Sequence, residues 1–484
     1  MTRNFLFVIL FTLLCCGDSV FSQEWEFFMD SYIESPYTRN FTDAIELSDG
    51  SIVINSPFKL PIEGHATVPH PGLVKISADG TELVRNNYFR PAYCSISYNQ
   101  ILENEDGELF TLMTYSPDHE RLSDNYFKNF DNPPTNAILG LYKIDDELNI
   151  VESYEHSFPI DTTENFDPMW DAMPNENCGR LYLFTSFIDN NGDIVGSFFK
   201  CPTFHSPNQA ENDSMFFFKM NFEGEILQMK GIECQSGHGD YWRHRGHSMV
   251  ETDSHYILYQ VLEHNDYNFS FIPSGEAWYF DKDMNFVDKK AIRQPGFTMP
   301  TVSYLEYVSA VRSRHNTVYL AALTRSVEKP HSYLYNDTRL YEIDDHLDNS
   351  TELLPIVNYI NRGSSDSQES QPLNNGVILK EDNTLIHVQN WNLGDGDGDS
   401  WVVIEHLDEN FETISEMYYT SGEDGIFIEV NSIVSTKEED LLLVGNANSL
   451  NGDKSWNFVT KFPASAFENI EEAHAHNLKV AVAY

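Results

Sequence analysis

The sequence comprises 484 residues, of which 75 are acidic and 30 are basic, so the formal net charge is −45. A surface this acidic repels nucleic acids and anionic membranes, and it suits cations and neutral or cationic ligands. A chain of this length would usually form two or three domains, but repetition lets a closed all-β domain grow to the same size.

The N-terminus has the organisation of a secretory signal peptide. Arg3 precedes an apolar run over residues 5–14, which is too short to span a bilayer as a helix. Val20 and Ser22 stand at the −3 and −1 positions of a cleavage site, which makes Gln23 the mature N-terminus. We therefore predict a signal peptide over residues 1–22, a secreted or cell-surface protein, and no transmembrane segment.

A repeated pattern organises residues 23–462. A polar turn, often with Gly or Asn, is followed by a β-rich apolar run, and this pattern occurs seven times at intervals of 56 to 75 residues. The runs begin at Ile52, Leu109, Leu181, Tyr256, Val318, Leu385 and Leu441. Each has one strand-like run upstream and two downstream, separated by turn signals. Seven units of four strands predict an all-β fold, a seven-bladed β-propeller with antiparallel blades.

The N-terminal strand is expected to close the ring. The seventh unit has three strands ending at Phe462, and no fourth strand follows directly. Residues 24–29 form an orphan strand before the first unit, and they would supply the missing edge. Closure matters because an open edge exposes unpaired backbone groups. We expect such a closed ring to be a monomer, with residues 463–484 forming a linker.

The seventh unit also carries a family resemblance. Residues 431–462, with the runs Ser432-Ile433-Val434 and Leu441-Leu442-Leu443, resemble the repeats of secreted Bacteroidetes β-propellers. The last nine residues, 476–484, look like the lead-in to a type IX secretion sorting domain, although the Pro-Asn-Pro that normally follows is absent. The resemblance implies this fold and export by that route, with the C-terminal sorting domain truncated or removed. It implies no activity.

Candidate binding residues gather where a propeller joins strand two to strand three and one blade to the next. These connections share one face, and the longest of them cover residues 56–71, 116–137 and 189–214. Counting nine residues back from each run places small or polar residues on the innermost strands, at Asp43, Gln100, Ala172, His247, Ser309, Gly376 and Ser432. They are expected to line the axis, either around water or around a ligand.

The densest polar cluster covers residues 238–247. Trp242, Arg243, His244 and His247 suit a carboxylate or a sugar, and imidazoles transfer protons near neutral pH. Arg90 and Trp170 occupy comparable positions before blades two and three and could converge with this cluster. The alternative is that these side chains serve only packing.

The cysteines and one acidic loop allow two further predictions. An exported chain permits disulfides, and Cys201 and Cys234 are the favoured pair because both fall on the loop side of the third blade. Cys178 is placed on the opposite side. The spacing of Asp395, Asp397 and Asp399 is typical of calcium loops, but the EF-hand pattern fails at Ser400 and His406, which leaves a different calcium site or a solvated acidic hairpin.

Two functions remain open at this point. The first is a binding or scaffold protein that recognises a glycan or an extracellular protein with its long loops. The second is an extracellular carbohydrate-active enzyme, a lyase or glycoside hydrolase, that uses the axial funnel. No catalytic motif is found, and fold alone does not decide between them.

Overall fold

The computed structural model describes most of the predicted propeller. The described residues are 25–30, 43–60, 68–91, 93–95, 100–117, 135–159, 180–201, 214–233, 243–265, 271–292, 303–313, 315, 317–326, 335–347, 356–361, 368–393, 400–419, 426–449 and 455–467. In this part of the chain, every element is a strand except one 3-10 helix, η2 (Ala464–Phe467), and no helix is long and apolar enough to cross a membrane.

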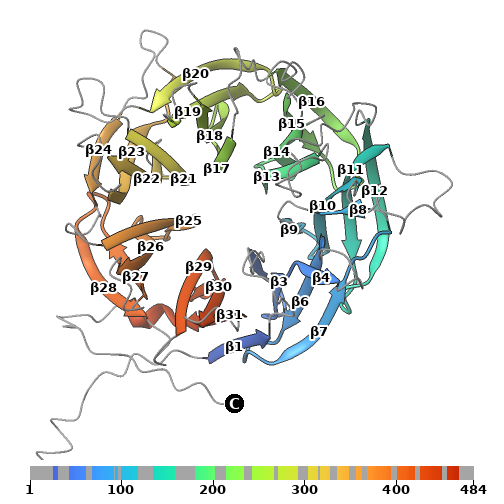
Figure 1. The fold of residues 1–484 in the computed structure, drawn as a ribbon, viewed down its shortest axis with the longest axis horizontal. Coiled ribbons are helices and arrows are strands. Elements are labelled where there is room, and N and C mark those ends of the chain that lie inside the picture. Colours follow the sequence, from blue (N-terminus) through green and yellow to red (C-terminus); the bar gives the residue numbers. More distant parts are fainter. Residues whose placement is uncertain are drawn as a thin grey trace, which may run out of the picture.

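Seven four-stranded antiparallel sheets surround a common axis, which confirms the predicted seven-bladed β-propeller (Figure 1). Blades 1 and 2 contain β2 (Ala44–Glu46), β3 (Ile52–Asn55), β6 (Gly72–Ile76) and β7 (Glu82–Asn87), then β8 (Tyr93–Cys94) with β9 (Gln100–Glu103), β10 (Leu109–Pro117), β11 (Asn136–Ile144) and β12 (Ile150–Pro159). Blades 3 and 4 contain β13 (Arg180–Ile188), β14 (Ile194–Cys201), β15 (Ser214–Met220) and β16 (Ile226–Glu233), then β17 (Arg243–Glu251), β18 (His255–Asn265), β19 (Phe271–Asp281) and β20 (Phe286–Ile292).

The remaining blades follow the same order from the axis outward. Blades 5 and 6 contain β21 (Ser303–Arg312), β22 (Thr317–Ser326), β23 (Tyr335–Asp344) and β24 (Ile356–Asn361), then β25 (Gln368–Leu379), β26 (Leu385–Leu393), β27 (Ser400–Leu407) and β28 (Thr413–Tyr419). Blade 7 contains β29 (Ile426–Ser435), β30 (Leu441–Ser449), β31 (Ser455–Phe462) and β1 (Trp25–Asp30). A two-stranded ribbon of β4 (Phe58–Leu60) and β5 (Val68–His70) extends the loop between β3 and β6.

The N-terminal strand closes the ring as predicted. β1 pairs antiparallel with β31, from Trp25 opposite Lys461 to Asp30 opposite Trp456. The Trp25 indole Nε1 donates a hydrogen bond to the carbonyl of Ala78, 2.7 Å away in the first blade. Gly80 leaves room for the indole, because a Cβ at that position would lie 2.8 Å from the ring. The backbone of β1 therefore completes the last blade, and the Trp25 side chain ties that blade to the first.

The core consists of seven hydrophobic clusters, one at each junction between neighbouring blades. Successive side chains on a strand point to opposite faces of its sheet, so one strand supplies two junctions. On β3, Ile52 and Ile54 pack against blade 7, whereas Val53 packs against blade 2. This explains why the second strand of each blade is apolar at consecutive positions rather than alternating.

Turn chemistry explains the Asp/Asn/Gly signals in the sequence. In the turn between β11 and β12, the Asp145 carboxylate accepts the N–H groups of Glu147 and Asn149 at 3.0 and 2.7 Å. Asp281 and Asp408 accept equivalent bonds in blades 4 and 6. Such turns also join the first and second strands, so all of them lie on one side of the ring, called the turn face below. The opposite side is called the loop face.

The third blade departs from the predicted alignment. The run beginning at Leu181 belongs to the innermost strand, β13, and the second strand is β14, which begins at Ile194. The prediction was wrong because the polar residues before Gly179 resemble the turn between the first and second strands. In the structure that turn spans Asp189 to Asp193. The innermost strand described for this blade begins at Arg180, at the loop face, and Ala172 lies outside the described residues.

Candidate functional site

The predicted site residues fall into three groups. Asp43, Arg90, Gln100 and His247 are described with their side chains. Arg243 and His244 begin β17, and Cys201 ends β14, but their side chains are outside the description. Trp170, Trp242, Cys234 and the calcium candidates Asp395, Asp397 and Asp399 lie outside the described residues. Two predictions therefore stay untested: the convergence of the 238–247 cluster with Trp170, and the calcium site.

The small and polar positions on the innermost strands form a ring around the axis, but two of the predicted members change. Pairing with the second strand identifies the equivalent residues as Asp43, Gln100, Thr185, Ser248, Ser309, Gly376 and Ser432. Thr185 replaces Ala172 because of the corrected alignment of blade 3. Ser248 replaces His247 because the turn in blade 4, from Thr252 to His255, is one residue shorter than the turn from Leu47 to Ser51.

His247 serves the junction between blades 3 and 4. Its imidazole stacks on the ring of Phe184, with centroids 3.8 Å apart and an interplanar angle of 28°. Phe184 lies on β13, the innermost strand of the preceding blade. The packing interpretation of this histidine is thus the one its described contact supports.

Two serines of the axial ring bind the neighbouring blade, and one ring member is a carboxyl group. Ser248 Oγ accepts the N–H of Ala310 at 2.9 Å, and Ser309 Oγ accepts the N–H of Gly376 at 3.0 Å, so these serines tie blade 4 to blade 5 and blade 5 to blade 6. Asp43 holds the equivalent place in blade 1, where its carboxylate accepts the N–H of Ala44 at 2.9 Å. Burial raises the pKa of Asp43 to about 7 despite that hydrogen bond.

On the loop face, Arg90 lies between blades 1 and 2. Its guanidinium donates to Glu155 Oε1 at 2.7 Å and lies 4.8 Å from the ring centroid of Tyr93 and 5.5 Å from that of Tyr115. Tyr142 donates to the same carboxylate oxygen at 2.9 Å. Burial lowers the pKa of Arg90, but Glu155 outweighs burial and the pKa rises. The guanidinium is thus held in one orientation while about a third of the side chain stays exposed.

An exposed aromatic ring adjoins Arg90. Phe89 is 48% exposed, and its ring meets buried His70 edge-on at 4.9 Å. His70 in turn lies 5.5 Å from Phe58, so the ribbon of β4 and β5 supports the connection that carries Phe89. Phe89, Arg90, Tyr93 and Glu155 together are called the loop-face patch below. It combines an apolar ring with hydrogen-bonding groups in fixed positions.

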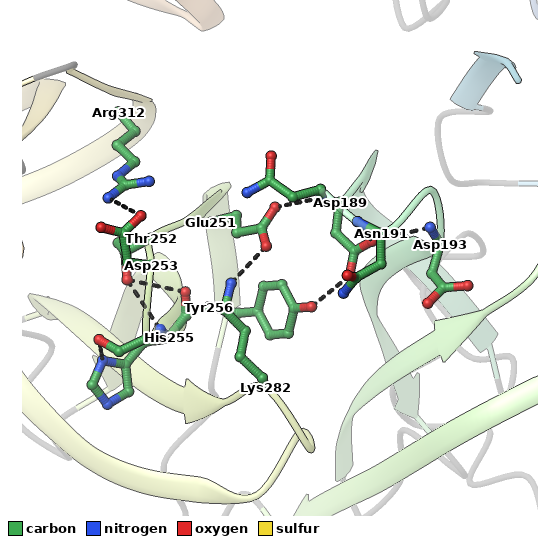
Figure 2. Close-up of polar contacts among 12 residues, drawn as sticks. Asp189, Asn191, Asp193, Glu251, Thr252, Asp253, His255, Tyr256, Lys282 and Arg312 are labelled. Atoms are coloured by element: carbon green, nitrogen blue, oxygen red, sulfur yellow. Dashed lines mark hydrogen bonds and ion pairs between the residues drawn. The ribbon is translucent and has the colours of Figure 1, made fainter. Parts of the chain in front are cut away.

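The turn face is held by contacts that run from one blade to the next. The last residue of an innermost strand binds the turn of the preceding blade: Glu46, Glu103 and Glu251 accept backbone N–H groups of Lys437, Ser48 and Asn190 at 2.7, 3.1 and 2.8 Å. In blade 5 the same position is Arg312, which pairs with Asp253 at 2.8 Å. Figure 2 shows the contacts of Glu251 and Arg312.

A buried carboxylate adds to the junction between blades 3 and 4. Asp189, whose side chain is fully buried, accepts a hydrogen bond from Lys219 at 2.8 Å. It accepts a second from Tyr256 at 2.6 Å, which Figure 2 shows. Burial by itself raises the pKa of Asp189, but the bonds from Lys219 and Tyr256 outweigh it and the pKa lies below its ordinary value. Lys282 binds Glu251 at 2.6 Å and lies 4.4 Å above the Tyr256 ring. These contacts support a rigid ring.

Three potential metal ligands lie together on the turn face of blade 5. Ligand atoms of Asp344, Asp345 and His346 all lie within 4.8 Å of one another. Arg312 lies 3.4 Å from Asp345, and His346 Nδ1 lies 2.9 Å from Asp344. The arginine already supplies the positive charge that these carboxylates need, so we assign no metal to them.

The predicted disulfide meets a topological difficulty. Cys201 ends β14 and lies opposite Arg180 of β13, whereas Cys234 follows β16, and β15 lies between β14 and β16. Strands separated by one other strand are about 10 Å apart, and Cα atoms of a disulfide are about 4.4–6.8 Å apart. The bridge therefore requires the chain after Glu233 to turn towards β14. It stays a prediction, and since β13 begins at the loop face, the argument that set Cys178 on the opposite face no longer holds.

Sequence reasoning missed several of these residues. It named Arg90 but not Phe89, Glu155 or the tyrosines, because their meeting depends on which loops cross between blades. Glu46, Glu103 and Glu251 were similarly overlooked among 75 acidic residues. Their shared place at the end of an innermost strand, just before a turn, was the available signal.

Comparisons with known proteins identify no family. No protein-family model and no curated protein matches the chain. Drosophila Plexin A, solved in complex with Semaphorin 1b, is 9% identical with a TM-score of 0.44, over 91% of this chain and 87% of that chain. A Dyadobacter fermentans protein of unknown function is 11% identical (TM-score 0.42, 78% and 96%), as is the NanB sialidase of Streptococcus pneumoniae (TM-score 0.42, 93% and 71%). These similarities are too low to carry an inference about function.

Proposed function

We propose that this chain is an extracellular binding protein whose loop face recognises a glycan. The observation that carries the proposal is the loop-face patch, where Phe89 is 48% exposed beside a guanidinium fixed by Glu155. An exposed ring can stack on the apolar face of a sugar, while the adjoining charged groups exchange hydrogen bonds with its hydroxyls. Because these groups are held in place before binding, little conformational entropy is lost when a ligand arrives.

The rest of the ring supports a recognition role. The scaffold is held by contacts between blades on the turn face and by the serine bonds at the axis. The long connections of the loop face can therefore vary in sequence and length without changing the fold. The net charge of −45 favours neutral or cationic ligands over anionic ones. A neutral glycan carries no negative charge, and it offers both an apolar face for Phe89 and hydroxyls for the adjoining charged groups.

Replacing Phe89 with alanine is expected to weaken glycan binding about tenfold or more, the usual effect of removing an aromatic contact at the centre of an interface. The measurement is a glycan array followed by calorimetry on the glycan that binds. Leu83→Ala is the matched control, because Leu83 is 56% exposed in the same blade but lies on β7, away from the loop face. Equal losses in both variants, or no glycan bound by the unaltered protein, would contradict the proposal.

A second function is favoured by one observation, the pKa of about 7 at Asp43. A carboxyl group that is half protonated at neutral pH can act as a general acid, which a glycoside hydrolase or lyase at the axis would need. Glu429, on the innermost strand of the adjacent blade 7, also has a pKa raised by burial. Turnover of a polysaccharide that Asp43→Asn abolishes would establish the enzyme in place of the binding protein.

The proposal includes export. We propose that residues 1–22 are removed as a signal peptide, that residues 463–484 form a linker, and that the protein leaves a Bacteroidetes cell through type IX secretion. The protein recovered outside the cell should begin at Gln23, which N-terminal sequencing checks. A mature protein that retains residues 1–22 would contradict this part of the proposal.

A further inference from the structure

The outermost strands of blades 1 to 6 share an exposed apolar residue at their second position. The residues are Leu83, Val151, Leu227, Val287, Val357 and Ile414, and they are between 42% and 60% exposed. Scattered apolar residues on a surface are ordinary, but six at one repeated position are not scattered. They therefore share a structural cause.

That cause is a β-bulge repeated in six blades. In blade 1, Ile76 lies opposite Glu82 and Lys75 lies opposite Val84, so Leu83 has no partner on the neighbouring strand. The same shift leaves Val151, Leu227, Val287, Val357 and Ile414 as the extra residues of their strands. A bulge bends its strand and increases its twist, and both effects break the regular row of N–H and C=O groups along the outer edge.

The seventh blade supplies the contrast. Its outermost strand, β1, pairs with β31 along its whole length with no shift of register. The start of this regular strand is covered, because Trp25 packs against Gly80 and donates to Ala78 in the turn of blade 1. The bulged strand β12 also contacts the next blade, since Tyr154 lies against Gly224 and His156 Nε2 lies 2.8 Å from its carbonyl oxygen. The bulge is therefore the feature that distinguishes the outer edges of blades 1 to 6 from that of blade 7.

We propose that the six bulges prevent the outer edges from accepting a strand of another molecule and thereby keep the ring monomeric. An outer edge strand is a template for pairing with a second copy of the chain, and a bulge is one of the devices that removes it. β12 has the most to protect, since at 10 residues it is the longest of these six strands. Self-association through these edges is independent of the proposed ligand.

Deleting Val151 tests the proposal, because it makes β12 regular against β11 without changing the pairs on either side. The deletion variant is expected to form dimers or larger species at about 100 µM, where the unaltered protein stays monomeric, as measured by sedimentation velocity. Val151→Thr is the matched control: it removes the exposed apolar side chain but keeps the extra residue, and it should stay monomeric.

The same deletion at Leu227 in β16 provides a second edge, and circular dichroism with thermal melting establishes that each variant is folded. Folded deletion variants that remain monomeric at both edges would overturn the proposal. So would a Val151→Thr variant that associates like the deletion, or association accompanied by loss of the native melting transition. Protection of β12 amides from hydrogen exchange in the associated form is the positive signature.

Discussion

Replacing Asp189 with alanine is expected to lower the free energy of unfolding by about 3–5 kcal/mol, the range for removing one partner of a buried ion pair. The substitution leaves the Lys219 ammonium, on a side chain that is 10% exposed, with the more distant carboxylate of Asp193 at 3.0 Å. It also removes the acceptor of the Tyr256 hydroxyl across the junction between blades 3 and 4. Urea unfolding at neutral pH measures the effect.

Two further variants separate the ion pair from the turn that Asp189 begins. Asp189→Asn retains an acceptor for the N–H groups of Asn191 and Asp193 but loses the charge, so it should be destabilised less than the alanine variant. Asp79→Ala removes an exposed aspartate from the turn of blade 1 and should leave stability nearly unchanged. If Asp189→Ala unfolds at the same urea concentration as Asp79→Ala, the buried contact does not hold the blades together.

The effect of pH on this contact has a defined sign. The pKa of Asp189 is lower in the folded protein than its ordinary value. The stability that its charged form contributes is therefore present above the unfolded pKa and is lost as pH falls through the folded pKa. The difference between the unaltered protein and Asp189→Asn should shrink below about pH 4, where the carboxylate of the unfolded chain is protonated.

The fold was predictable because the signals of its repeat are local in the sequence. Asp145 and Asp281 close their turns with their own side chains, and the apolar runs of the blades pack on both faces. Each blade can therefore be recognised from a few consecutive residues. Closure by β1 was predictable for a related reason: three strands ending at Phe462 require a fourth. Neither prediction requires knowledge of distant side-chain contacts.

The details that failed depend on one or two residues of turn length or on neighbours from other blades. Ser248 takes the place predicted for His247 because one turn is a residue shorter, and that shift exchanges the two faces of the strand. The prediction for Leu181 is wrong by one strand because an apolar innermost strand looks like a second strand. The partnership of Arg90 with Glu155 spans 65 residues, and no local pattern encodes it.

Asp43 is the residue at which the two candidate functions predict different results. Its pKa is raised by burial from 3.8 to about 7, so the charged form is disfavoured in the folded protein. The stability that the neutral carboxyl contributes is fully present below the unfolded pKa and is lost as pH rises through the folded pKa. A tenfold change in an ionisation constant corresponds to about 1.4 kcal/mol, so the loss between pH 4 and pH 8 approaches about 4 kcal/mol.

Asp43→Asn removes this titration, because an amide of nearly the same shape stays neutral. The variant is expected to be more stable than the unaltered protein by about 3–4 kcal/mol at pH 8 and to differ little from it at pH 4. Urea unfolding at pH 4, 6 and 8 measures this, and Asp79→Asn is the control, since the pKa of Asp79 is lowered rather than raised. Equal stabilities of Asp43→Asn and the unaltered protein at pH 8 would show that Asp43 ionises normally.

The same variant separates the two functions. Active sites often retain residues that lower the stability of the folded protein, and a buried carboxyl that ionises near neutral pH is such a residue. If Asp43 is a catalytic acid, Asp43→Asn should lose activity and gain stability. A binding protein that uses its loop face should gain the stability and keep its glycan affinity, since Phe89 and Arg90 belong to the outer connection between blades 1 and 2, whereas Asp43 lies at the axis. Asp43→Asn and Phe89→Ala therefore affect different measurements under the two functions, and together they decide between them.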